Sequence, residues 1–216
     1  MANTNEVGSL IALANQNSNV LFVVVGSEAI LRQENGWGYG LPEADVIAHV
    51  NRARQNVAVP VTVAEPWHIW TNHPALVEAV DLIFINEHPY WEGQPIGSAL
   101  NHVVTKYREI HDLYPHKPIV ISETGWPSGG LANGPAQPSL SNQVAFAREF
   151  LAWAGQEGVD FFWFEAFDEA WKTNEPNGVG PTWGIYLADR TAKTRPRQTH
   201  CHRPLRLAEH LKIRKF

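Results

Sequence analysis

Short apolar runs alternate along this chain with longer amphipathic segments, and this alternation limits the folds that the chain can adopt. Each run is rich in Val, Ile or Phe and is bounded by turn residues, which is typical of a strand. The predicted strands are residues 20–26, 59–64, 81–86, 118–122 and 160–164, and the predicted helices between them are residues 43–56, 98–113 and 141–157. The order of these elements predicts an α/β fold with a parallel sheet.

The number of strands leaves two α/β architectures open. Five strands are too few to close a barrel, and the pattern alone also permits a doubly wound sheet. Residues 5–20 are typical of a helix that leads directly into the first strand, so the chain starts within a β/α unit. In an eight-stranded (β/α)8 TIM barrel, about three units would be missing in front. We therefore expect an incomplete barrel from a fragment or an N-terminally truncated sequence.

The charged residues divide the chain into an acidic body and a basic tail. Before Arg190 there are 8 Lys and Arg against 21 Asp and Glu, whereas residues 190–216 carry 9 against a single Glu209. Nucleic-acid-binding proteins present a basic surface, so the body is a poor candidate for one. We expect residues 1–194 to form the domain. Residues 195–216 would be a surface-binding arm or, as we expect, a frameshifted or read-through end that is not native to it.

Other bulk features give further expectations. The longest apolar run is much shorter than the roughly 18 to 20 residues of a membrane span, and the first residues lack the pattern of a signal peptide. We therefore expect no membrane segment in this chain. The single cysteine, Cys201, excludes an internal disulfide and a Cys-rich zinc site.

A glutamate follows each predicted strand within about two residues. The five are Glu28, Glu65, Glu87, Glu123 and Glu165. The carboxyl ends of all strands of a β/α barrel meet on one face, where the active site forms. Any one of these acids could instead cap a helix or face solvent, but a shared site explains all five better. Two carboxyl groups with different pKa values are what glycoside hydrolysis requires.

Aromatic residues follow the same glutamates. They are Trp67, Tyr90, Trp91, Trp126 and Trp171. Flat rings suit a cleft that packs against sugar rings while a few polar groups fix their orientation. We expect Trp153 and Trp163 to lie in the core instead, because they fall within a predicted helix and a predicted strand.

Three other chemistries lack their usual motifs. The histidines form neither HxxxH nor HExxH on a predicted helix, so we expect no metal. The glycines of residues 127–135 are not followed by the Lys-Ser/Thr pair of a phosphate-binding loop. Ser122 and Ser128 lie outside any GxSxG arrangement, which disfavours a serine hydrolase. We expect no cofactor.

Two segments resemble glycoside hydrolase family 17, the β-1,3-glucanases and β-1,3-glucanosyltransferases. They are VVVGSEAILR at residues 23–32 and IVISETGWPSGG at residues 119–130. The resemblance implies a retaining TIM-barrel enzyme with Glu28 as the acid/base after strand four and Glu123 as the nucleophile after strand seven. Counting residues 20–26 as the fourth strand makes the strand before Glu123 the seventh, so the chain would cover about strands four to eight.

Further segments carry the resemblance into the substrate site. NEHPYW is similar to the family's Asn-x-x-Pro-Tyr segment, which implies that Asn86 and Tyr90 lie near the substrate, with the Tyr90 hydroxyl close to the nucleophile. FEAFDEAWK resembles FxxFxExxK, which places Glu169 and Lys172 in the sugar cleft. The remaining residues expected at substrate subsites are Glu65, Trp67, Trp91, Trp126 and Glu165.

Ser27 departs from the family pattern. The family usually has an asparagine there, which hydrogen-bonds the sugar 2-hydroxyl, and such a bond strengthens in the transition state. We expect Ser27 to lie at the substrate, with a slower reaction unless another group supplies this bond.

The expected function is hydrolysis of β-1,3-glucan, endo- or exo-acting, through a covalent glycosyl-enzyme. The partner would be a β-glucan oligosaccharide or polysaccharide, and the family implies a secreted, cell-wall or periplasmic location. Two alternatives use the same chemistry: a β-glucan transglycosylase, and a glycosidase module of a membrane β-glucan synthase. A third, from another class, is an inactive carbohydrate-binding barrel fragment, which Ser27 and the missing strands would favour.

Overall fold

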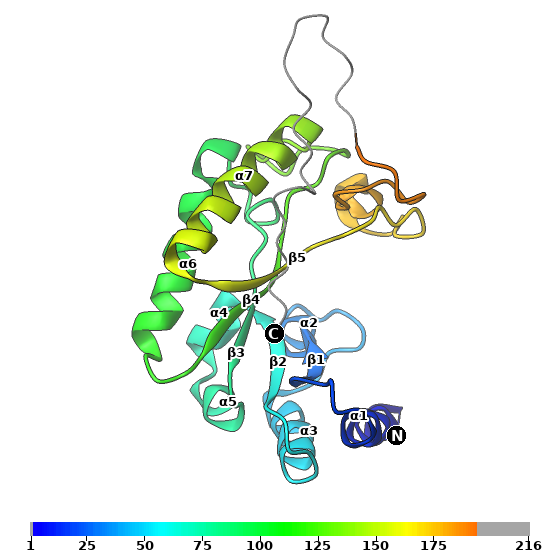
Figure 1. Cartoon of the computed structure of the whole chain (residues 1–216), viewed down its shortest axis with the longest axis vertical. Helices are drawn as coiled ribbons and strands as arrows, with labels where there is room; N and C mark the ends of the chain where they lie inside the picture. Colours follow the sequence, from blue (N-terminus) through cyan, green and yellow to red (C-terminus); the bar gives the residue numbers. More distant parts are fainter. Residues whose placement is uncertain (1, 194–216) are drawn as a thin grey trace, which may run out of the picture. The chain divides into compact units, whose positions relative to one another are not determined.

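The computed structural model describes residues 2–193, which form two compact units (Figure 1). The first unit comprises residues 2–86 and 106–122, and the second comprises residues 87–105 and 123–193. The basic tail predicted at residues 195–216 lies outside the described residues. No helix among residues 2–193 combines the length and the apolar composition that a bilayer crossing requires.

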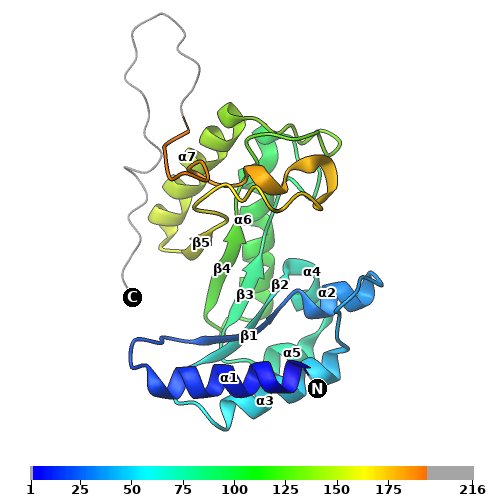
Figure 2. The ribbon, with the colours of Figure 1, turned by 90° about the vertical axis from the view of Figure 1, so that its right-hand side faces the viewer.

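The first unit holds most of the parallel strands. Its strands, in sheet order, are β1 (Val23–Ser27), β2 (Val61–Pro66), β3 (Ile83–Asn86) and the first four residues of β4 (Ile119–Thr124). Its helices are α1 (Ala2–Gln16), α2 (Ala29–Glu34), α3 (Glu43–Arg54), α4 (Trp67–Asn72), α5 (Pro74–Ala79) and the end of α6 (Ile96–Leu113). Figure 2 shows α1 beside α3, and the two helices pack against each other. Strand β2 pairs in parallel with both β1 and β3.

The core of the first unit explains why its strands are apolar on both faces. Every residue of β2 and β3 is buried, as in parallel strands that are covered by helices. Val61 and Ile83 of these strands belong to the same cluster as Trp70 of α4 and Leu76 of α5, all fully buried.

The second unit is built around aromatic side chains. It contains the last two residues of β4, the beginning of α6, helix α7 (Leu140–Glu157), strand β5 (Asp160–Trp163) and the 3-10 helices η1 (Pro176–Gly178) and η2 (Gly180–Thr182). The Phe150 ring of α7 contacts the Phe161 ring of β5 edge-on, with ring centroids 4.9 Å apart. Phe146, one turn earlier, stacks on Phe150 and lies 5.9 Å from Trp163. Aromatic packing thus joins α7 to β5, while Trp153 and Trp163, which we expected in the core, are only half-buried.

The five predicted strands and the three predicted helices between them are confirmed. Strands β1, β2 and β3 begin two or three residues later than predicted. Helices α2, α4 and α5 were not predicted, because six residues are too few to show a helical period. Helices α2 and α4 start at the carboxyl ends of β1 and β2, where the chain turns away from the sheet.

The end of β1 is irregular. Val24 pairs with Thr62 and Ser27 with Ala64, so three steps along β1 match two steps along β2. A bulge of this kind turns the strand locally and redirects the side chain that follows it. That residue is Glu28, whose backbone adopts the left-handed conformation with φ of 54°.

Candidate active site

The five glutamates at the strand ends differ in how exposed their side chains are. The exposed fractions are 29% for Glu123, 25% for Glu28, 15% for Glu165 and 2% for Glu87, while Glu65 as a whole residue is 0% exposed. A carboxyl group that reacts with a substrate has to be accessible. By this measure, Glu28 and Glu123 are accessible, and the other three acids are more buried.

In the first unit, Glu28 is held by Asn86. The Asn86 Nδ2 group donates a hydrogen bond to Glu28 Oε1 at 3.1 Å, and Ser122 Oγ donates to Asn86 Oδ1 at 2.7 Å. The Ser122 hydroxyl thus orients the amide so that its nitrogen faces Glu28. Asn86 is 3% exposed, so its amide is held in the interior with Nδ2 directed at the Glu28 carboxylate.

Two other residues lie close to Glu28. Ser27 is exposed, and its hydroxyl oxygen lies 3.5 Å from Asn86 Nδ2. Arg32 Nη2 is 3.8 Å from Glu28 Oε2, one helical turn further along. The Arg32 Nη1 group donates to the Ser27 carbonyl at 2.7 Å, which ties the arginine to the turn. An amide and a guanidinium therefore face the Glu28 carboxylate.

Glu65 lies beneath the same turn. Its Oε1 accepts a hydrogen bond from the Ile30 N–H at 2.9 Å, and its Oε2 accepts one from the Leu31 N–H at 3.3 Å. Burial raises its pKa to about 7, against the opposing effect of these two hydrogen bonds, and Glu28 raises it further. The side chain has no exposed surface, so its role has to differ from the substrate contact that we expected.

Trp67 is the remaining expected site residue of the first unit. It is the first residue of α4 and is half-buried. The Lys106 ammonium lies over its ring, 3.4 Å from the ring centre, as in a cation–π pair.

In the second unit, Glu123 lies beside His88. The His88 Nε2 atom is 3.3 Å from Glu123 Oε2, and the His88 ring packs edge-on against Phe164 and Trp183 with 5.2 Å between ring centres in both pairs. The Glu87 N–H also donates to the Glu123 carbonyl at 2.7 Å. His88 was not predicted as a site residue. The sequence feature that could have predicted it is its position directly after Glu87, at the end of a strand.

The segment after Glu123 requires a glycine. A Cβ atom at Gly125 would lie 2.0 Å from the carbonyl oxygen of Phe164. That distance is far below any allowed contact, so only glycine lets the two backbones approach this closely. Gly125 thereby brings the SETGWPS segment close to the end of β5.

Tyr90 and Trp126 are fully buried in the second unit. The Tyr90 hydroxyl donates to the Leu131 carbonyl at 2.8 Å and accepts from Asn177 Nδ2 at 3.1 Å. Burial raises the Tyr90 pKa. The Trp126 indole N–H donates to the Gln137 carbonyl at 3.1 Å. Both side chains thus hold loops, and it is His88 rather than the Tyr90 hydroxyl that lies at hydrogen-bond distance from Glu123.

Trp91 differs from its neighbour Tyr90. It is 37% exposed, and its ring lies 6.1 Å from that of Trp183 at a tilted angle. Part of the indole is therefore available to a ligand.

Glu165, Glu169 and Lys172 form one ionic group. The Lys172 ammonium is 2.8 Å from Glu165 Oε2 and 2.6 Å from Glu169 Oε2. Burial raises the Glu165 pKa to about 7; Lys172 lowers this pKa, and Glu169 raises it. Burial disfavours the charge of Lys172, but the two carboxyl groups outweigh it and raise the Lys172 pKa. The three side chains fix one another and keep the lysine charged.

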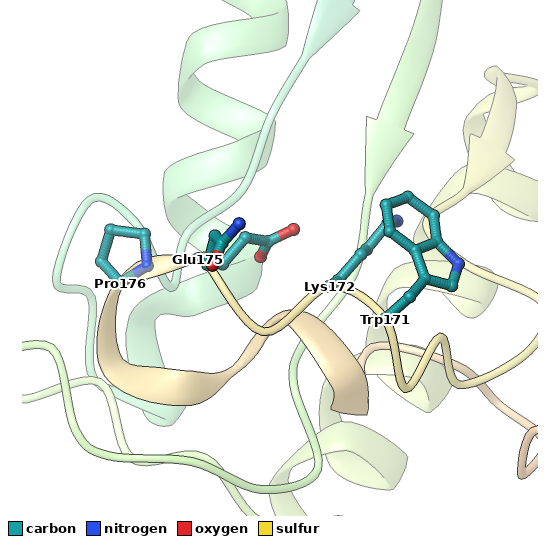
Figure 3. Close-up of a pocket in the computed structure, with 5 residues that line it drawn as sticks. Trp171, Lys172, Glu175 and Pro176 are labelled. Atoms are coloured by element: carbon teal, nitrogen blue, oxygen red, sulfur yellow. The ribbon is translucent and has the colours of Figure 1, made fainter.

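A pocket of about 360 Å³ lies beside this group. It is lined by Trp171, Lys172, Asn174, Glu175 and Pro176. Figure 3 shows Trp171 and Lys172 at one end, with Glu175 and Pro176 further along the same segment. The Trp171 side chain is highly exposed, and burial raises the pKa of Glu175. A flat indole beside charged and amide groups is suited to a sugar ring, whose faces are weakly polar and whose rim carries hydroxyls.

Within residues 2–193, no three His, Cys, Asp or Glu side chains come close enough together to hold a metal ion.

Residues 1–184 match the family described as the BtgE/BtgC glycoside hydrolase domain. The chain belongs to this family. A glucan 1,3-beta-glucosidase of Schizosaccharomyces pombe is 30% identical to it over 190 residues, which cover 81% of this chain and 57% of the relative. A glucan 1,3-beta-glucosidase of Arthroderma benhamiae is 32% identical over 197 residues, which cover 81% of this chain and 60% of the relative. The chain thus spans less than two thirds of the length of these relatives.

Solved structures agree with this assignment. The crystal structure of a glycoside hydrolase family 17 β-1,3-glucanosyltransferase from Rhizomucor miehei superposes with a TM-score of 0.78 and 28% identity, over 88% of this chain and 69% of that chain. An active-site mutant of the same transferase, in complex with laminaritriose, superposes with a TM-score of 0.77 and 28% identity, over the same shares of the two chains. The predicted relation to glycoside hydrolase family 17 is confirmed.

Proposed function

We propose that this domain cleaves β-1,3-glucan with retention of configuration, with Glu123 as the nucleophile and Glu28 as the acid/base. One observation carries the proposal: the two most exposed strand-end acids are the two that the family resemblance assigns to catalysis. We further propose that β1 to β5 are the fourth to eighth strands of a (β/α)8 barrel. The similarity to the R. miehei structure supports this architecture.

The proposed reaction has two steps. The Glu123 carboxylate attacks the anomeric carbon while Glu28 gives its proton to the leaving glycosidic oxygen, which produces a covalent glycosyl-enzyme. Glu28, now ionised, takes a proton from water, and the resulting attack releases the sugar from Glu123. This mechanism requires the two carboxyl groups to lie about 5 Å apart, whereas a separation near 9 Å would belong to an inverting enzyme.

The neighbours of each acid suit these steps. Asn86 donates to Glu28 and fixes its direction without adding charge, so the carboxyl group can alternate between acid and base. His88 is placed to orient the Glu123 carboxylate through its Nε2 atom. Each reacting group thus has a positioned partner before a substrate binds.

We propose that the substrate is a β-1,3-linked glucan chain, as an oligosaccharide or a polysaccharide. The laminaritriose bound by the R. miehei enzyme supports this substrate class. The exposed rings of Trp91 and Trp171 would pack against glucosyl units, and Lys172 and Glu175 would bind hydroxyls. A secreted or cell-wall location belongs to the same proposal.

Transfer to a second glucan chain is the other candidate outcome, because the R. miehei relative is named a glucanosyltransferase. In that case the hydroxyl of an acceptor sugar replaces water in the second step. Incubation of the chain with laminarihexaose and analysis of product lengths distinguishes the two. If all products are shorter than the hexaose, the reaction is hydrolysis. Products longer than the hexaose indicate transfer. Binding of the hexaose without any product would contradict both and would favour a carbohydrate-binding domain.

A further inference from the structure

We infer that Glu65 is a positioning residue for Glu28: its buried carboxylate holds the turn that carries the acid/base. This inference rests on the proposed role of Glu28. It also replaces the substrate contact expected for Glu65, whose side chain is fully buried.

Two consecutive residues of β2 hold the chain on both sides of the Glu28 side chain. The Glu28 N–H donates to the Ala64 carbonyl at 2.7 Å. Two and three residues after Glu28, the N–H groups of Ile30 and Leu31 donate to the two carboxylate oxygens of Glu65 at 2.9 and 3.3 Å. A shift of the turn relative to β2 would therefore break hydrogen bonds on one side or the other.

The turn needs such a constraint, because its local conformation is unfavourable. Glu28 has φ of 54°, a region that residues other than glycine rarely adopt. Holding a non-glycine residue there costs about 1 kcal/mol or more. The bulge before Ser27 also removes regular pairing next to the turn. Contacts from outside the turn must therefore keep Glu28 in place, and the Glu65 carboxylate supplies two of them.

The Glu65 backbone is itself well fixed. The indole N–H of Trp70 donates to the Glu65 carbonyl at 3.1 Å and to the Phe84 carbonyl at 2.9 Å. Trp70 is fully buried in the core of the first unit. The core thus locates the Glu65 backbone, the Glu65 carboxylate locates the turn, and the turn locates Glu28.

The test is the variant Glu65→Gln, compared on two substrates at pH 8, where the Glu65 carboxyl group with its pKa of about 7 is ionised in the parent. An amide of the same size keeps one acceptor oxygen but turns its NH2 group toward a backbone N–H, so one of the two bonds is lost. Protonation by Glu28 matters for a sugar leaving group and hardly at all for 2,4-dinitrophenolate, which leaves without a proton. We expect kcat/KM to fall about tenfold or more on laminaritriose and less than about threefold on 2,4-dinitrophenyl β-laminaribioside.

The matched control is Glu34→Gln. Glu34 belongs to the same helix α2, but its carboxylate pairs with His73. This variant should leave kcat/KM unchanged on both substrates. An equal loss on both substrates in Glu65→Gln would show a purely structural effect and would overturn the inference.

The variant Glu28→Ala separates failure of the inference from failure of the proposed function. If Glu28 is the acid/base, this variant loses activity on laminaritriose far more than on the dinitrophenyl substrate. If Glu28→Ala loses activity equally on both substrates, the proposed role of Glu28 fails. If Glu28→Ala shows the larger loss on laminaritriose while Glu65→Gln resembles the parent protein on both substrates, only the inference about Glu65 fails.

Hydrogen exchange tests the contact independently of activity. We expect the amides of residues 28–34 to exchange about tenfold faster in Glu65→Gln than in Glu34→Gln, because local opening becomes easier. Equal exchange in the two variants would mean that the Glu65 carboxylate does not hold the turn.

Discussion

The Nε2 atom of His88 lies 3.3 Å from the Oε2 atom of Glu123. The rings of Phe164 and Trp183 pack edge-on against the imidazole, so its orientation is fixed. The other ring nitrogen, Nδ1, is buried without a hydrogen-bond partner among the described residues. Among the described residues, the hydrogen bond of the imidazole is therefore made to Glu123, the proposed nucleophile.

Replacing His88 by alanine should slow formation of the glycosyl-enzyme. The Glu123 carboxylate loses the group that orients it, and we expect the first-step rate to fall about tenfold or more. Pre-steady-state release of dinitrophenolate measures this step. The control is His111→Ala, which changes an exposed histidine on α6. A first-step rate in His88→Ala equal to that of the control would show that His88 does not orient the nucleophile.

The raised pKa of Glu65 predicts a dependence of stability on pH. A folded-state pKa of about 7 against 4.5 means that the folded protein retains a proton that the unfolded chain has lost. The stabilising contribution is complete below pH 4.5 and is lost as the pH rises through 7, up to about 3 kcal/mol in total. In urea unfolding at pH 4.5, 5.5 and 7, Glu65→Gln should show a smaller decrease in stability with pH than the parent. An unchanged decrease would contradict the raised pKa.

Lys172 should be required for stability at neutral pH. In Lys172→Met, the carboxylates of Glu165 and Glu169 lose the ammonium that neutralises them. We expect the free energy of unfolding to fall by about 2 to 4 kcal/mol at pH 8, because partly buried charges are left unpaired. The loss should be smaller at pH 5, where Glu165 with its raised pKa holds a proton. An equal loss of stability at both pH values would contradict the view that Lys172 stabilises the fold by neutralising the Glu165 carboxylate.

Trp171 should contribute to binding of long substrates. Its indole is exposed and lines the pocket beside Lys172, so we expect its removal to leave the fold intact. We expect Trp171→Ala to raise KM for laminarihexaose about tenfold, equivalent to about 1.4 kcal/mol, with little change for an aryl glucoside. The control is Trp37→Ala, which changes another exposed tryptophan in the first unit. A uniform change on both substrates would argue against a distal sugar subsite.

The strands and long helices were predictable because burial on both faces leaves a continuous apolar pattern in β2 and β3. The exposure of Glu28 and Glu123 was not predictable in this way. Glu65 follows its strand just as they do, yet it is buried because the N–H groups of Ile30 and Leu31, some 35 residues away, hold its carboxylate. Likewise, the hydrogen bond from the Tyr90 hydroxyl to the Leu131 carbonyl, 41 residues away, could not be read from the NEHPYW segment. Such choices between neighbouring side chains depend on tertiary contacts that a local pattern does not contain.

The most direct measurement is covalent trapping of the nucleophile. A 2-deoxy-2-fluoro laminaribiosyl fluoride slows both steps but forms the glycosyl-enzyme faster than water releases it. Glu123 displaces the anomeric fluoride, so mass spectrometry of the intact chain should show one added 2-deoxy-2-fluoro-laminaribiosyl group. Peptide mapping should place it on Glu123, with none in Glu123→Gln. Labelling of another residue, or none in a chain that cleaves laminaritriose, would contradict Glu123 as the nucleophile of a retaining enzyme.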